Sequence, residues 1–247
     1  SSPTSLLLNL GHAMDHWVIA IFLYTVSVIA GVWGADWKEL TPYAFGASFM
    51  FGAGSIVSGK LGDQWGRRVM MIVFFAGMGV SCLLIALCQN KWQIGAALTV
   101  MGAFASIYHP VGIPMLVQKA DKPGFVIGVN GLVGNLGIAI GASLSVLLAT
   151  RFGWQMAYVV PGVVSLIAAA LFHFLVPNEK EAPSKRKAKV LDLPPNATLS
   201  EIKARYKALA KIHHPDANGG ARDAEEKLKE INAAYSTLRA SEHLPLE

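Results

Sequence analysis

The sequence predicts an all-α protein in which six membrane-spanning helices are followed by a small soluble helical hairpin. The uneven distribution of charge is the first observation behind this prediction. Residues 1–176 carry eight basic and five acidic residues, whereas the remaining 71 residues carry thirteen and eleven, although 53% of the whole chain is hydrophobic. This split excludes a single soluble domain. Only two cysteines are present, which excludes a disulfide-rich scaffold.

Long apolar segments are the second observation. A helix that crosses a bilayer needs about 20 mostly apolar residues, and six segments of the first part meet this length or approach it. Their connections are short, so helices adjacent in sequence are expected to be antiparallel. The predicted spans are Leu6–Val32, Tyr43–Ser58, Val69–Cys88, Trp92–Val117, Phe125–Thr150 and Trp154–Val176.

Basic residues predict the orientation of these spans. The connections after the second and fourth spans, together with residues 178–189 after the sixth, hold ten Lys and Arg residues. The other three connections hold only Lys38, Lys91 and Arg151. Because Lys and Arg concentrate on the cytoplasmic side, both termini are expected in the cytoplasm, and the lipid bilayer is expected to be a bacterial-type inner membrane.

The connection between the second and third spans carries a compact motif, GKLGDQWGRR, over residues 59–68. Glycines permit a tight turn, Asp63 is expected to cap the third span, and the arginines are expected to anchor the cytoplasmic face. The motif resembles the loop motif of the major facilitator superfamily (MFS), with Gln64 where that family usually has a basic residue. The residues that carry the resemblance are Gly59, Asp63, Gly66, Arg67 and Arg68.

The resemblance implies half of an MFS transporter fold. Span four adds the stretch YHPVGIP at residues 108–114, which is similar to fosmidomycin-resistance-like members. MFS substrate sites lie between two six-helix halves. A carrier would therefore need a homodimer or a second half-chain. The sequence identifies neither the solute, nor the coupling ion, nor the direction of transport.

Ionisable residues inside the spans mark a candidate proton or substrate site. His12, Asp15 and His16 lie on one arc of about 100° of the first helix, and Asp15 is the one acid within a predicted span. An intramembrane carboxylate is costly and is a functional candidate by default. Spans one and four line the cavity in MFS members, so His109 is expected to join this site. The alternative is a structural Asp–His pair that holds two helices together.

Two further alternatives concern the same region. Asn130 and Asn135 of span five are either polar groups of a cavity, for which Asn135 is the candidate, or contacts between helices. The i, i+4 spacing of His12 and His16 also suits one cation, for which His109 would supply a third nitrogen. The prediction is nevertheless that the chain has no metal site and no cofactor.

The second part divides into a linker, a hairpin and a tail. Residues 178–189 are basic and lack apolar periodicity, which predicts a flexible linker. A capping box at residues 198–201 is expected to open a first helix, and a second helix is expected from about Arg222 to Leu238. The predicted division is therefore a transmembrane domain at 1–177, the linker at 178–189, the hairpin at 190–240 and a frayed tail at 241–247.

The hairpin resembles a J domain, the Hsp70-stimulating module of the DnaJ family. The resemblance rests on the order VLxL, EIKxxYxxLA, HPD and IxxAYxxL at the family's spacing. It implies that His214, Pro215 and Asp216 trigger ATP hydrolysis by an Hsp70-type chaperone. It also implies that basic residues of the first helix contact the acidic surface of Hsp70, and these residues are Lys203, Arg205, Lys207 and Lys211.

The sequence thus predicts a membrane-anchored co-chaperone that recruits Hsp70 and stimulates its ATP hydrolysis. No catalytic residue is expected, because the chain shows no phosphate loop or nucleophile constellation, so the protein is predicted not to be an enzyme. The basic linker lacks interleaved aromatic residues, which argues against a nucleic-acid partner. One alternative is a secondary transporter of a small solute, proton-coupled through Asp15. The other is a truncated or fused gene product.

Overall fold

A computed structural model describes residues 2–118, 120–177, 190–194, 197–214, 218 and 222–241. The chain divides into two compact units, Ser1–Val176 and Pro177–Glu247. All regular structure in the described residues is helical, which confirms the predicted all-α class.

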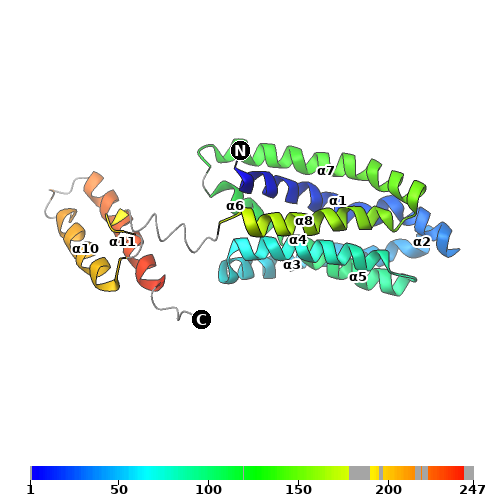
Figure 1. Cartoon of the computed structure of the whole chain (residues 1–247), viewed down its shortest axis with the longest axis horizontal. Coiled ribbons are helices and arrows are strands. Elements are labelled where there is room, and N and C mark those ends of the chain that lie inside the picture. The colour runs from blue at the N-terminus through cyan, green and yellow to red at the C-terminus, as the bar shows by residue number, and fades with distance from the viewer. Residues whose placement is uncertain are drawn as a thin grey trace. The chain divides into compact units, whose positions relative to one another are not determined.

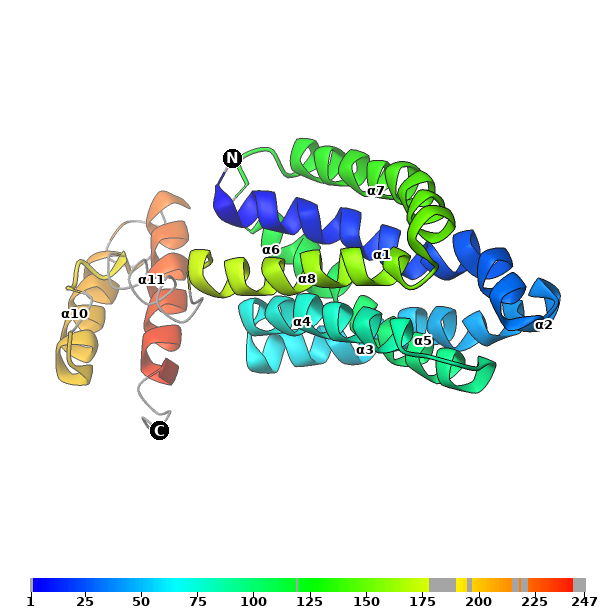
Figure 2. The same cartoon turned by 45° about the vertical axis from the view of Figure 1, so that its right-hand side comes forward.

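The first unit is a bundle of long apolar helices that lie side by side (Figures 1 and 2). Six helical stretches are long and apolar enough to cross a membrane, which confirms the six predicted spans. Two of them consist of several consecutive pieces. The elements are α1 (Pro3–Trp33), α2 (Trp37–Leu40), the 3-10 turn η1 (Thr41–Ala44), α3 (Phe45–Trp65), α4 (Arg67–Ala86), α5 (Lys91–Ala105), the π-helical turn η2 (Tyr108–Gly112), α6 (Ile113–Val117), α7 (Pro123–Phe152) and α8 (Met156–Leu175).

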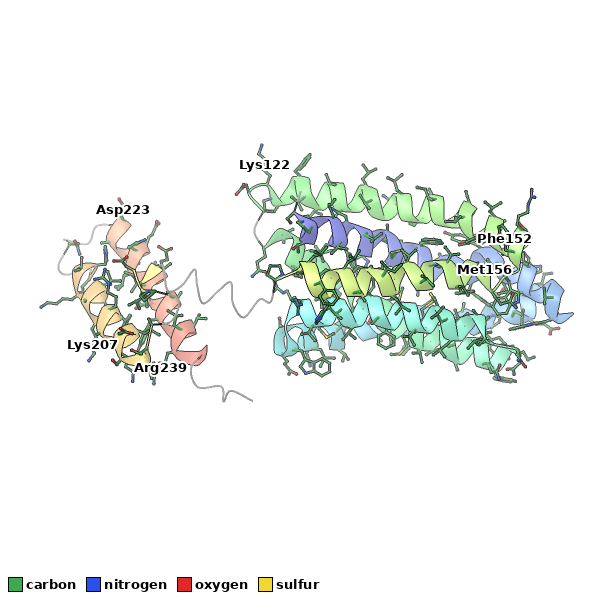
Figure 3. All side chains as sticks on the ribbon, in the orientation of Figure 1. Lys122, Phe152, Met156, Lys207, Asp223 and Arg239 are labelled. Carbon is green, nitrogen blue, oxygen red and sulfur yellow. The ribbon has the colours of Figure 1, made fainter. Side chains whose placement is uncertain are left out.

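The two ends of the bundle can be followed in Figure 3. Lys122, at the start of α7, lies at one end, and the N-terminus of the chain lies at that same end in Figure 1. Phe152 and Met156, which flank the turn between α7 and α8, lie at the opposite end. The short connections therefore reverse the chain as predicted, and the sixth span returns to the end from which the first begins.

The helices extend further into the GKLGDQWGRR motif than the sequence analysis placed them. A polar connection was expected over Lys60–Arg68, but α3 continues to Trp65 and α4 begins at Arg67. Gly66 alone makes the turn, with φ at 90°, a conformation that favours glycine. Asp63 is consequently an exposed residue in the last turn of α3, and no side chain caps α4. The prediction that Asp63 caps the third span is wrong.

Glycines allow α1 and α7 to pack with their backbones close together. A Cβ added at Gly137 would lie 2.6 Å from Ala13 Cα, and one added at Gly141 would lie 2.6 Å from Trp17 Cγ. Trp17 Nε1 also donates a hydrogen bond to Ser145 Oγ across this contact, at 2.9 Å. Small residues permit such close approach in lipid, where dispersion contacts replace the hydrophobic effect.

The second unit is a hairpin of α10 (Leu199–Ile212) and α11 (Arg222–Ser241). The predicted capping box is confirmed, because Thr198 N–H donates to Glu201 Oε2 at 2.7 Å and Glu201 N–H donates to Thr198 Oγ1 at 3.4 Å. Tyr206 and Tyr235 stack between the helices, with ring centroids 4.0 Å apart. The buried core consists of Leu191, Ile202, Ile231, Ala234 and Leu238.

Candidate functional site

The fourth span is not a continuous helix. The sequence predicts one helix over Trp92–Val117, but the structure has the π-helical turn η2 between α5 and α6. Pro110 and Pro114 lack the N–H that a regular helix needs at those positions, and π-turns are frequent at functional sites. This turn carries Tyr108, which is fully buried, and His109, which is half-buried.

Four ionisable side chains meet where α1 contacts η2, and they are called here the histidine–aspartate cluster: His12, Asp15, His16 and His109. His109 Nε2 lies 3.3 Å from Asp15 Oδ2. His16 Nε2 lies 3.0 Å from His12 Nε2. One ring nitrogen from each histidine lies within 4.8 Å of the other two. The structure therefore brings together the four predicted ionisable residues of the intramembrane site.

Asp15 is the most deeply buried member of the cluster, with an exposed fraction of 0%. Neither of its carboxylate oxygens has a hydrogen-bond partner among the described residues. His109 Nε2 approaches its Oδ2 to 3.3 Å without hydrogen-bond alignment. A buried carboxylate in this state carries a large desolvation cost.

A neutral hydrogen-bond network lies beside the cluster and joins α1, η2 and α7. Asn130 Nδ2 donates to Asn9 Oδ1 and to Tyr108 Oη, both at 2.9 Å. Tyr108 Oη in turn donates to the carbonyl of Leu8 at 2.8 Å. The backbone carbonyl of Asn130 accepts from His12 Nδ1 at 2.8 Å. Asn130 therefore connects the neutral network to the cluster.

Asn135, the predicted cavity residue of span five, lies away from the cluster. It is exposed, whereas Asn130 is buried with 2% of its surface accessible. Five residues along an ideal helix correspond to a rotation of about 140°, so the two amides occupy different sides of α7. The helical spacing from Asn130 to Gly134 and Gly137, the glycines that face α1, is the signal that identifies the asparagine on the α1 side of the helix.

The loop-motif residues support the cluster from outside. Gly59 and Gly62 face η2: a Cβ added at Gly62 would lie 2.9 Å from Val111 Cγ2, and one at Gly59 would lie 3.7 Å from Pro110 Cβ. Arg68 donates to the carbonyls of His173 and Val176, the latter at 2.6 Å. The motif thus leaves room for the π-turn and caps the end of α8.

A second candidate site is the basic surface of α10. Lys203, Lys207 and Lys211 are exposed and share one face, because they follow each other at i, i+4 and i+8. Figure 3 labels Lys207 on this helix. Arg205 was predicted to belong to the same face, but it lies elsewhere on the helix. Its Nε donates to the Leu191 carbonyl at 3.1 Å and its guanidinium pairs with Asp192 at 2.6 Å.

The predicted tripeptide follows α10 directly. His214 is exposed just after the helix ends, whereas Pro215 and Asp216 lie outside the described residues. Asn218 Nδ2 donates to the carbonyls of Ile212 and His214, at 2.7 and 3.0 Å. These bonds satisfy carbonyl groups at the C-terminal end of the helix. The sequence pattern around the tripeptide does not predict this role of Asn218.

Comparison with known families identifies the families to which the sequence is similar. The family model of the Major Facilitator Superfamily matches residues 6–215. The chain belongs to the Major Facilitator Superfamily. The model of the DnaJ domain matches residues 189–243, so this superfamily member carries a J domain after its sixth span. It is a multi-pass membrane protein.

Individual relatives match the two parts separately. The 4-hydroxybenzoate transporter PcaK of Acinetobacter baylyi is 27% identical over 187 residues, which covers 65% of this chain and 39% of the transporter. The chaperone protein DnaJ of Caldicellulosiruptor saccharolyticus is 54% identical over 57 residues, 23% of this chain and 15% of that chaperone. The MFS proton:xylose symporter XylE has a similar fold, with a TM-score of 0.63 at 14% identity over 95% of this chain and 54% of that chain. The chain thus spans little more than half of the symporter and less than half of the two curated relatives.

Proposed function

We propose that this MFS member is a membrane-anchored J-domain co-chaperone that recruits an Hsp70-type chaperone and stimulates its ATP hydrolysis. The observation that carries the proposal is the surface of α10, where Lys203, Lys207 and Lys211 are exposed on one face and His214 follows the end of the same helix. An exposed basic face suits an acidic partner surface through charge complementarity. The HPD tripeptide of residues 214–216 then triggers ATP hydrolysis by the bound Hsp70.

The proposal places the J domain in the cytoplasm, beside an inner membrane of bacterial type. The distribution of basic residues supports this placement, because the bundle end that holds Lys122 and the arginines of the loop motif is the end at which α8 finishes. We also propose that the chain divides into a transmembrane domain, a linker over 178–189 and a J domain over 190–240. The chain itself performs no chemistry, because ATP is hydrolysed by Hsp70.

The test is the ATPase rate of a bacterial Hsp70 with the full chain in lipid nanodiscs. The wild-type chain is expected to stimulate the rate, and His214→Gln is expected to abolish the stimulation. Replacement of Lys203, Lys207 and Lys211 by alanine is expected to raise the concentration needed for half-maximal stimulation. The matched control replaces three exposed basic residues of α11, Lys227, Lys229 and Arg239, by alanine. Equal effects of the two triple replacements would refute the proposed contact face.

The histidine–aspartate cluster favours a second function, transport of a small solute with proton coupling. Asp15 is fully buried without a hydrogen-bond partner in the described residues, and His109 approaches it from the π-helical turn of the fourth span. A carboxylate that takes up and releases a proton beside an imidazole is the chemistry that such coupling requires. A carrier of this kind works as a homodimer or with a second half-chain.

The carrier proposal is tested by uptake into proteoliposomes under an imposed proton gradient. The substrate of the similar transporter, 4-hydroxybenzoate, is the first solute to try. Uptake by the wild-type chain that is lost in Asp15→Asn supports the proposal. The control is the double variant Asp15→Asn/Asn135→Asp, which is expected to restore no uptake, since Asn135 lies on another side of α7. Absence of gradient-driven uptake in the wild-type chain speaks against coupling for that solute.

A further inference from the structure

The ring nitrogens of the histidine–aspartate cluster are arranged as ligands around a common point. His12 Nε2 and His16 Nε2 are 3.0 Å apart, and one ring nitrogen from each of the three histidines lies within 4.8 Å of the other two. Two nitrogens that are each about 2.0–2.1 Å from a tetrahedral zinc ion lie about 3.3–3.4 Å apart. The first pair is therefore already near the spacing of a shared ion, and His109 is the third imidazole of the set.

The hydrogen bond to the Asn130 carbonyl sets the tautomer of His12 that metal binding needs. A carbonyl oxygen can only accept, so the bond to the Asn130 carbonyl places the proton of His12 on Nδ1. Nε2 of His12 then accepts the hydrogen bond from His16 Nε2, and an ion bound at this point would take the place of the His16 proton. This is the arrangement in which a backbone carbonyl orients a ligating histidine through its other ring nitrogen.

Asp15 lies behind the third histidine and would orient it once an ion is bound. His109 Nε2 faces Asp15 Oδ2 at 3.3 Å, which leaves Nδ1 of His109 as the nitrogen available to an ion. A carboxylate behind a ligating imidazole raises its basicity and fixes its ring. The carboxylate of Asp15 is fully buried and has no hydrogen-bond partner in the described part of the chain. A cation held by the three imidazoles would compensate this buried negative charge.

The surroundings hold the rings in place and give access to them. Gly134 of α7 leaves the space that His12 occupies, since a Cβ there would lie 2.7 Å from His12 Cε1. Tyr108 stacks on His12 with ring centroids 4.9 Å apart. His109 keeps 37% of its side chain exposed, so its ring reaches the surface of the bundle.

From this geometry we infer that His12, His16 and His109, oriented by Asn130 and Asp15, form a binding site for one divalent transition-metal ion. Imidazole nitrogens favour zinc, nickel, cobalt and copper over magnesium and calcium. The inference goes beyond the co-chaperone proposal and does not depend on it. Its test involves no Hsp70, so a failure of either proposal leaves the other standing.

The experiment titrates Co²⁺ into the full chain, purified in detergent with a tag free of histidine and stripped with a chelator. The expected result is one equivalent of Co²⁺ with intense visible d–d absorption, displaced by one equivalent of Zn²⁺. His16→Gln is expected to abolish these bands, and Asp15→Asn is expected to weaken binding about 10–100-fold. The matched control carries His173→Gln and His213→Gln, two histidines outside the cluster, and is expected to bind like the wild type.

Folding of the variants is checked by gel filtration and by the unfolding temperature without metal. Zn²⁺ is expected to raise the unfolding temperature of the wild type and of the control, but not that of His16→Gln. If His16→Gln does not fold, His109→Asn provides the same comparison. A wild-type chain without the absorption bands, or bands that persist in a folded His16→Gln variant, would overturn the inference.

Discussion

Substitution of Gly137 by alanine tests the packing that positions the first span. The new Cβ would lie 2.6 Å from Ala13 Cα, a backbone atom that cannot rotate away. Overpacking of this kind costs about 1–3 kcal/mol, whereas the better helix propensity of alanine returns about 0.8–1.0 kcal/mol. Because the clash is with backbone, we expect the upper part of that range and a net destabilisation of about 2 kcal/mol.

Gly131 provides the matched control on the same helix. A Cβ added there meets no atom within 4 Å, so Gly131→Ala is expected to stabilise α7 by about 0.5–1 kcal/mol through propensity alone. The two variants therefore shift stability in opposite directions, although both replace a glycine by an alanine in α7.

A thiol-reactive dye follows thermal unfolding of the purified chain in detergent, because Cys82 has an exposed fraction of 0% and reacts once the bundle opens. A difference of 1 kcal/mol corresponds to about 2–4 °C for a chain of this size. Gly137→Ala is expected to unfold below the wild type and Gly131→Ala at or above it. Equal unfolding temperatures for the two variants would refute the close packing of α1 on α7.

Four further predictions concern other parts of the chain. Arg205→Ala is expected to lower the stability of the J domain by about 1 kcal/mol, because a partly exposed ion pair and a hydrogen bond to a carbonyl are lost. Lys207→Ala, in contrast, is expected to leave the melting temperature unchanged and to weaken the stimulation of Hsp70. Asn218→Ala removes the two hydrogen bonds from Asn218 to the carbonyls of Ile212 and His214, and the ATPase assay is expected to show reduced maximal stimulation with an unchanged melt by circular dichroism. The pKa of Glu201 is lowered because the backbone N–H and hydroxyl of the capping threonine donate to its carboxylate. The Glu201 carboxylate therefore stabilises the folded J domain above the ordinary pKa near 4.5, and this stabilisation is lost as the pH falls through the lower folded pKa. A pH series of melts on the segment 189–247 should therefore show a steeper acid loss for the wild type than for Glu201→Gln. Arg68→Ala is expected to destabilise the bundle by about 1.5–3 kcal/mol, because a charged donor to two carbonyls at the end of α8 is removed; the same thiol assay measures it.

The parts of the fold that depend on local pattern could be predicted from the sequence. Apolar length determines the spans, and the capping box with its apolar stripe determines where α10 begins and which face it buries. The meeting of His12, Asp15 and His16 also follows from helical spacing alone. The contact of His109 with Asp15 required the family resemblance, because nothing local links spans one and four.

The remaining features depend on tertiary contacts that a local pattern does not contain. The sequence placed a connection at Lys60–Arg68, but Gly66 reverses the chain in one residue and leaves the flanking segments helical. Arg205 has the same charge as Lys203 and Lys207, but its guanidinium reaches a carbonyl and Asp192 that precede the helix. Asn130 can be distinguished from Asn135 only by its helical spacing to the glycines at which α7 packs against α1.

The neutral network bears on the role of the histidine–aspartate cluster. Asn130, Tyr108 and Asn9 already tie α1, η2 and α7 together with uncharged hydrogen bonds. A purely structural role for the cluster would add a desolvated carboxylate to a junction that is held without it. The Asp15 carboxylate also contributes little as a structural group, because neither of its oxygens accepts a hydrogen bond from the described residues. The arrangement is therefore better explained by something that the cluster binds, a proton or a metal ion, than by the helix packing that surrounds it.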